Sequence, residues 1–137
     1  MPETETKVVN DDGIEVAAGE RGELWIRGPQ VMKGYWEAKE ESAEALTSDG
    51  WFKTGDYVEI SDDGYISIVD RKKDMILVSG FNVFPNEIED WVNRHPGVLE
   101  CAAIGVPSEK TGESIKLFIV PSQKDLDIES VRAHCKE

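Results

Sequence analysis

A change of pattern near residue 70 constrains this 137-residue chain more than any other feature. Before it, short apolar runs alternate with polar residues and are separated by turns rich in glycine and aspartate, a pattern typical of antiparallel strands. After it, strand-like runs are interrupted by amphipathic helical ones. The charge changes there too: residues 1–70 carry 17 acidic and 6 basic side chains, whereas residues 71–137 carry 11 and 9. We therefore expect an α+β fold class with two structural units, residues 1–70 and 71–137.

The first half is expected to form a small β-barrel-like subdomain. Strands are predicted at residues 6–9, 23–27, 57–60 and 65–69. Gly64 closes the loop between the last two strands and supplies the left-handed residue that a bulged hairpin needs. The one helix-like stretch, residues 38–46, has a thin apolar face, so we expect it to lie on the surface.

The second half is predicted to have the order β-α-β-β-α. Strands are predicted at residues 75–78, 98–106 and 115–120, with a turn at residues 79–82. A helix begins at Pro85, because proline suits the first helical position, and Asp127 caps a last helix. That last helix reaches Glu137 without a stop signal, so a truncated α+β lid domain is expected.

Composition excludes several classes of protein. The formal net charge of −13 disfavours binding to nucleic acid or to anionic membrane surfaces. No apolar run approaches the roughly 20 residues of a membrane span, and the first residues do not resemble a signal peptide. Two cysteines make neither a disulfide framework nor a metal site. We therefore expect a reduced, cytoplasmic protein without a metal site of its own.

Neither a Gly-x-x-x-x-Gly-Lys-Ser/Thr nor a Gly-x-Gly-x-x-Gly phosphate motif is present. The candidate binding residues that remain are polar clusters predicted on turns. The carboxylate of Asp56, in the sequence Thr-Gly-Asp, can accept hydrogen bonds from both hydroxyls of a cis-diol such as ribose. The alternative is that it braces its own turn. The basic residues 71–73 offer positive charge to an anion or form a solvated patch. Residues 79–82 let backbone approach a ligand or form a simple turn.

Four segments, taken in order, resemble the later motifs of a single family. They are GELWIRG at residues 22–28, GYW at 34–36, DGWFKTGD at 49–56 and the long run at 70–89. This set resembles the adenylate-forming enzymes, which include acyl-CoA synthetases, peptide-synthetase adenylation domains and firefly luciferase. Residues 49–89 are similar to the signature of fatty-acid–CoA ligases, and residues 28–36 look most like the bacterial long-chain enzymes.

The resemblance implies an ATP-dependent acid–thiol ligase. Such an enzyme joins a fatty acid to AMP, releasing pyrophosphate, and then transfers the acyl group to the thiol of CoA, with Mg2+ required. It also implies roles for residues of this chain: ATP or AMP binding for Asp56 and Arg71, a hinge at Lys73, and CoA binding for Ser79, Gly80, Phe81 and Lys110.

The resemblance further implies that the catalytic set is incomplete in this chain. The family's phosphate loop and acyl tunnel precede its matching region, and the adenylation lysine lies beyond Glu137. We therefore expect a fragment of a long-chain fatty-acid–CoA ligase that is inactive alone, provides no Mg2+ ligand and self-associates, and whose parent enzyme is cytoplasmic or peripheral to the inner membrane. The alternatives are another adenylate-forming ligase, for an aryl or medium-chain acid, and a non-catalytic binding module.

Overall fold

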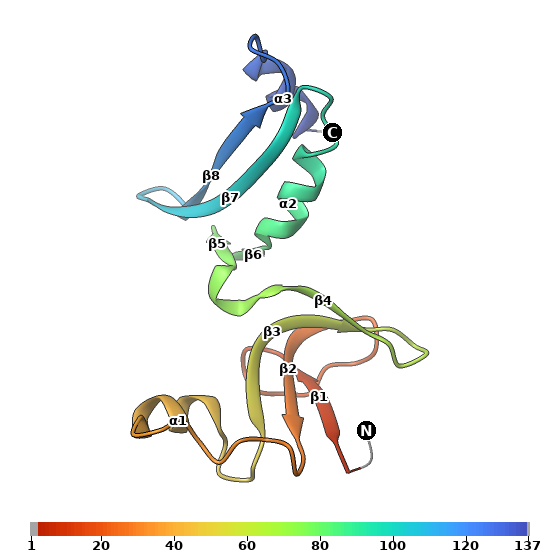
Figure 1. Ribbon diagram of the computed structural model, residues 1–137, viewed down its shortest axis with the longest axis vertical. Helices are drawn as coiled ribbons and strands as arrows, with labels where there is room; N and C mark the ends of the chain where they lie inside the picture. Colours follow the sequence, from red (N-terminus) through yellow and green to blue (C-terminus); the bar gives the residue numbers. More distant parts are fainter. Residues whose placement is uncertain (1–2, 137) are drawn as a thin grey trace. The chain divides into compact units, whose positions relative to one another are not determined.

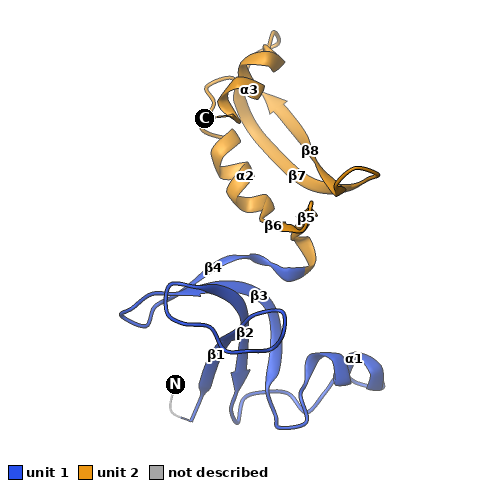
Figure 2. Ribbon diagram, turned by 180° about the vertical axis from the view of Figure 1, so that it is seen from behind, with its two compact units in different colours: residues 1–72 blue, residues 73–137 orange. Residues whose placement is uncertain are grey.

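The computed structural model describes residues 3–136 and divides the chain into two compact units, Met1–Lys72 and Lys73–Glu137 (Figure 2). The division falls after Lys72 because Arg71 still belongs to the last strand of the first unit. Each unit contains one antiparallel sheet with helix beside it, so the expected α+β class is confirmed. Among the described residues, no helix is long and apolar enough to cross a bilayer.

The first unit is a four-stranded antiparallel sheet in chain order. Its elements are β1 (Glu5–Val9), β2 (Arg21–Arg27), α1 (Lys39–Ala45), β3 (Phe52–Ile60) and β4 (Ile66–Arg71) (Figure 1). Buried apolar side chains on β1 and β3, among them Val9 and Val58, form its core. Helix α1 buries none of its residues, as its thin apolar face predicted.

The expected barrel-like form of the first unit is not found as a closed barrel. The sheet order β1-β2-β3-β4 leaves β1 and β4 as two edges, and within the described residues these two strands do not pair. Closure would require hydrogen bonds between them, and four strands in an open order do not provide these. The hairpin predicted around Gly64 is confirmed, with Gly64 at φ +85°.

The second unit contains a four-stranded antiparallel sheet in the order β6-β5-β8-β7, with two helices. Its elements follow the short 3-10 helix η1 (Lys72–Asp74) and are β5 (Ile76–Val78), β6 (Phe81–Val83), α2 (Pro85–Val92), β7 (Val98–Ser108), β8 (Gly112–Pro121) and α3 (Ile128–His134) (Figure 1). Both predicted helix starts are confirmed: Pro85 is the first residue of α2, and the carboxylate of Asp127 accepts a hydrogen bond from the backbone N–H of Glu129.

The core of the second unit forms where α2, α3 and β7 meet. Val92 of α2, Val98 of β7 and Val131 of α3 are buried together, so both helices contribute apolar side chains to the same core. Partly buried side chains of β8, such as Leu117, pack against this cluster. Helix α3 ends at His134, and the terminal residue to which it was expected to run lies outside the described residues.

The predicted order of elements in the second unit lacks one strand. Residues 79–82 were expected to form a turn, but only Ser79 and Gly80 do so, and Phe81–Val83 pairs with Ile76–Val78 as β6. Ser79 has φ +52° and Gly80 has φ +84°, the two left-handed residues of a two-residue hairpin turn. Such a turn reverses the chain at once, so the order is β-β-α-β-β-α.

Candidate functional site

The Thr-Gly-Asp segment forms a bulge inside β3, not a turn between elements. Thr54, Gly55 and Asp56 lie opposite Leu24 alone in β2, where the pairing register shifts. Gly55 has φ +73°, in the left-handed region that favours glycine. Extra residues in one strand bend the strand and redirect its side chains. The bulge therefore determines the direction of Asp56.

Asp56 and Arg71 form a cross-strand ion pair in the first unit. They are register partners in β3 and β4, and Arg71 Nη1 lies 2.8 Å from Asp56 Oδ1. The Asp56 side chain is 24% exposed and that of Arg71 is 55% exposed, so solvent and ligands can reach both. The structure thus brings together the two residues for which the sequence predicted nucleotide binding, with a carboxylate able to accept further hydrogen bonds.

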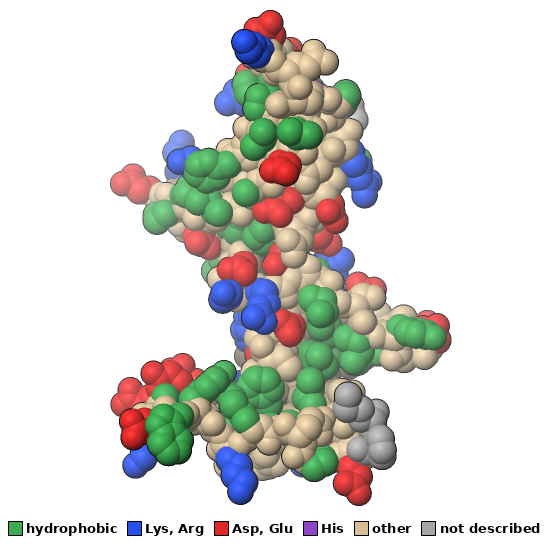
Figure 3. Space-filling model, viewed as in Figure 1, with side chains coloured by type: hydrophobic (Ala, Val, Ile, Leu, Met, Phe, Trp, Pro, Cys, Tyr) green, Lys and Arg blue, Asp and Glu red, His purple; other side chains and the backbone are tan. Residues whose placement is uncertain are grey.

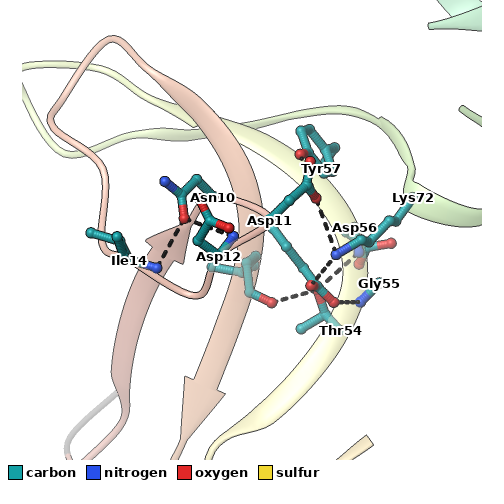
Figure 4. Close-up of polar contacts among 11 residues, drawn as sticks. Asn10, Asp11, Asp12, Ile14, Thr54, Gly55, Asp56, Tyr57 and Lys72 are labelled. Atoms are coloured by element: carbon teal, nitrogen blue, oxygen red, sulfur yellow. Dashed lines mark hydrogen bonds and ion pairs between the residues drawn. The ribbon is translucent and has the colours of Figure 1, made fainter. Parts of the chain in front are cut away.

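The bulge is held by side chains of two strands and of the segment after β4, as Figure 4 shows for the labelled residues. Thr54 Oγ1 donates to the carbonyl of Leu24 at 2.8 Å and accepts from the backbone N–H of Asp56 at 3.1 Å. The backbone N–H of Gly55 donates to Glu23 Oε1 at 3.2 Å. These bonds satisfy backbone groups that the bulge removes from the regular ladder.

Lys72 links this bulge to a second acidic side chain. Its Nζ lies 3.0 Å from Glu23 Oε2 and 3.4 Å from Asp11 Oδ1, and the hydroxyl of Tyr57 donates to the same Asp11 oxygen at 3.3 Å. Burial lowers the pKa of Lys72, but the hydrogen bond and charge of Glu23, with the charge of Asp11, outweigh it and raise that pKa overall. Burial, followed by the charge of Asp11, raises the pKa of Tyr57.

Sequence reasoning missed Glu23 and Asp11 as parts of this site and considered Lys72 only as one charge of a basic patch. The available signal for Glu23 was an acidic residue directly before an apolar strand run that begins at Leu24. Its partner Lys72 lies 49 residues away, so no local pattern connects the two.

The residues predicted to bind CoA lie in the second unit, at turns next to one another. Ser79 and Gly80 form the β5–β6 turn, and Phe81, which follows them, is 74% exposed. The backbone N–H of Ser79 donates to the carbonyl of Thr111 at 2.8 Å, so this turn contacts the β7–β8 turn in which exposed Lys110 lies.

Lys73 lies in η1 as the first residue of the second unit. Within residues 3–136, no group of three or more His, Cys, Asp or Glu side chains is arranged to hold a metal ion.

Comparison with known proteins identifies the family. The family described as AMP-binding enzyme matches residues 1–36, and the AMP-binding enzyme C-terminal domain matches residues 87–137. The chain is 52% identical to the long-chain-fatty-acid–CoA ligase of Escherichia coli O157:H7 over 99% of its length. It is 45% identical to the feruloyl-CoA synthase of an Amycolatopsis species over 87% of its length.

A solved structure shows the same fold: ATP-bound MatB of Rhodopseudomonas palustris matches 99% of this chain, with a TM-score of 0.90 and 36% identity. The match covers 27% of that chain, and the two curated relatives are each covered over 24% of their length. This chain thus spans about a quarter of the length of the proteins it matches. From these matches at both ends and the likeness over almost its whole length, the chain belongs to the adenylate-forming, AMP-binding enzyme family.

Proposed function

We propose that this chain is the C-terminal region of a long-chain fatty-acid–CoA ligase. In the reaction, a fatty-acid carboxylate oxygen attacks the α-phosphorus of ATP and pyrophosphate leaves. The thiol sulfur of CoA then attacks the acyl carbonyl and AMP leaves. The observation that carries the proposal is the Asp56–Arg71 pair at 2.8 Å, found in a chain that is 52% identical to such a ligase.

In this proposal, Asp56 binds the ribose of ATP. A carboxylate accepts hydrogen bonds only, so it suits the two hydroxyl donors of a cis-diol. Arg71 holds one carboxylate oxygen and adds a second polar contact near the ribose. The bulge supports this role, because it presents Asp56 from a backbone that Thr54 and Glu23 hold in place.

The remaining assignments concern the second unit and the hinge. Lys73 is proposed as the point about which the small domain turns between the adenylation and thioester-forming poses. Ser79, Gly80 and Phe81 line the path of the pantetheine arm, and Lys110 contacts the CoA nucleotide. The proximity of the 79–80 turn to the 109–111 turn supports a shared CoA role. The proposal assigns Mg2+ and the adenylation lysine no residue in this chain, and it places the enzyme in the cytoplasm, at the inner membrane face when it takes up fatty acid.

A second candidate is an aryl-acid ligase, favoured by the 45% identity to a feruloyl-CoA synthase. The two candidates differ in the acid they activate, so adenylation assays with a long-chain fatty acid and with ferulate distinguish them. We expect the full-length enzyme that carries this chain to prefer the fatty acid. If the enzyme adenylates neither the fatty acid nor ferulate, a non-catalytic binding module is favoured.

Removal of a ribose hydroxyl tests the role of Asp56. A hydrogen bond to a charged group contributes about 1.5–3 kcal/mol, which corresponds to about ten- to hundredfold in a rate or equilibrium constant. In the full-length enzyme, 2′-deoxy-ATP and 3′-deoxy-ATP are expected to lower kcat/KM by about that factor relative to ATP. Asp56→Ala is expected to cost at least as much, because it removes both bonds.

The test depends on whether the effects of Asp56→Ala and of removing a ribose hydroxyl are additive. Once Asp56 is alanine, the deoxy analogues should be almost as good as ATP, because their partner is already absent. If Asp56 only braces the bulge, the variant will still discriminate as strongly as the wild type, and Asp56 leaves the site. Asp62→Ala, which removes an exposed carboxylate from the loop after β3, is the matched control and should keep full discrimination.

We also predict that the 137-residue chain self-associates through its second unit. Ile104 of β7 and Phe118 and Val120 of β8 lie on one face of the sheet and are 44%, 50% and 47% exposed. Hydrophobic side chains gather over the β7–β8 hairpin in Figure 3. An exposed apolar patch of more than a few hundred Å² usually marks an interaction site.

Light scattering over a series of protein concentrations measures the self-association of the chain. The average mass is expected to rise above that of a monomer, and more so at high salt, which screens the repulsion between chains of net charge −13. Phe118→Glu should shift the chain back towards monomer. A monomeric mass at high concentration in both low and high salt would contradict the prediction.

A further inference from the structure

Glu23 is a carboxylate buried in the first unit. Its side chain is only 8% exposed, although it belongs to β2 in an otherwise strongly acidic part of the chain. A buried carboxylate is unfavourable unless hydrogen bonds or an ion pair compensate for the lost water. The hydrogen-bond partners of its two oxygens therefore show which groups compensate for its burial.

One oxygen of Glu23 holds the backbone directly before Asp56. Oε1 accepts the N–H of Gly55 at 3.2 Å, at the position in the bulge where the backbone is left-handed. The N–H of Gly55 is thereby satisfied by a side chain instead of by the ladder of β2. Loss of this acceptor would free the peptide that directs the Asp56 side chain.

The other oxygen holds the residue directly after Arg71. Oε2 accepts from Lys72 Nζ at 3.0 Å, and Lys72 adjoins Arg71 at the end of β4. The backbone N–H of Arg71 is held as well, by Asp70 Oδ1 at 2.7 Å. A single carboxylate thus reaches the neighbours of both members of the Asp56–Arg71 pair.

From this geometry we infer that Glu23 is a positioning residue for ribose recognition: it sets the bulge that carries Asp56 and the strand end that carries Arg71. The inference rests on the proposed function, because ribose recognition is assigned there to Asp56. Glu23 itself makes no contact with the nucleotide in this scheme. Its effect must therefore pass through Asp56 and Arg71, and it must appear as loss of discrimination between ribose forms.

The test is the ratio of kcat/KM for ATP to that for 3′-deoxy-ATP, measured in the full-length enzyme that carries this chain. Glu23→Ala is expected to lower this ratio about tenfold, as coupling between contacting groups typically allows. Glu23→Gln keeps an amide oxygen that can accept from Gly55, so it should restore a large part of the ratio. In the Asp56→Ala background, Glu23→Ala should change the ratio no further.

A matched control separates positioning from general stability. Glu59→Gln changes another acidic residue of the same sheet, paired on the surface with Arg21, and should leave the ratio unchanged. A purely structural role for Glu23 would lower the melting temperature and the yield but not the ratio. If Glu23→Ala does not fold, Lys72→Met replaces it, and a ratio equal to that of the wild type overturns the inference.

Two failures are distinguishable. If the wild type does not discriminate between ATP and 3′-deoxy-ATP, the proposed ribose site fails and the positioning role falls with it. If the wild type discriminates between ATP and 3′-deoxy-ATP and Asp56→Ala abolishes this discrimination, but folded Glu23→Ala discriminates fully, only the positioning role fails.

Amide hydrogen exchange of Gly55 in the 137-residue chain adds a readout that does not depend on activity. The exchange rate is expected to be about tenfold faster in Glu23→Ala but unchanged in Glu59→Gln. An unchanged rate in Glu23→Ala overturns the inference.

Discussion

Pyrophosphate release from ATP and a fatty acid is expected to be undetectable when the 137-residue chain is assayed alone. The chain spans about a quarter of the length of its relatives, and the family resemblance assigns the phosphate loop and the adenylation lysine to parts of the enzyme outside these residues. Removal of one electrostatic donor from a site for a transferring group costs about 10²–10³ in rate. Several such groups are assigned outside this chain, so their losses together should remove all measurable activity.

The assay compares the chain with a blank that lacks protein and with the full-length enzyme. A fatty-acid-dependent signal above the blank would contradict the prediction and would require a complete adenylation site within these residues. Contaminating ATPase activity is recognised by its independence of the fatty acid, and the Asp56→Ala variant of the same chain provides a further check.

Lys73→Pro is expected to separate the two half-reactions of the full-length enzyme. Lys73 lies in η1, and 3-10 helices have φ near −50 to −70°, close to the −65° that proline imposes. Proline should therefore fit the conformation described here and oppose a change of φ at the hinge. Placing proline in an incompatible backbone costs about 3 kcal/mol, so the half-reaction that needs the other pose should slow by about a hundredfold.

Single-turnover formation of acyl-adenylate and its conversion to acyl-CoA, measured separately, test this prediction. Lys73→Ala removes the same charge but leaves φ free, so it should preserve both half-reactions far better than proline does. An equal loss of both half-reactions in folded Lys73→Pro protein would refute the hinge role. A large loss with Lys73→Ala would instead indicate that the ammonium group takes part in the chemistry.

Local signals in the sequence were enough for most elements of the fold. Pro85 and Asp127 marked the starts of two helices, because a missing N–H and a capping carboxylate act within a single turn. Alternating apolar residues marked the long strands. Strand β6 was missed, because three residues after a tight turn carry too short a pattern, and its existence depends on pairing with β5.

Closure of the first sheet was beyond the reach of local patterns as well. Alternation shows which residues share a face of a strand, but it does not show whether the first and last strands of a sheet meet. The open order β1-β2-β3-β4 is a property of how the strands assemble. The expectation of a barrel-like subdomain was based on the number of strands alone, and it was wrong because that number does not show whether the sheet closes.

The sequence by itself marked Asp56 and Arg71 as candidates, because the motifs around them resemble those of the adenylate-forming enzymes. The tertiary structure then paired the two side chains across β3 and β4. Only the tertiary structure decided that Thr-Gly-Asp is a bulge opposite Leu24, since the bulge exists relative to the register of β2. The same holds for Glu23 and Lys72, which are 49 residues apart. Tertiary packing brings a buried carboxylate such as Glu23 next to its cation, and no periodic pattern in the sequence predicts such an ion pair.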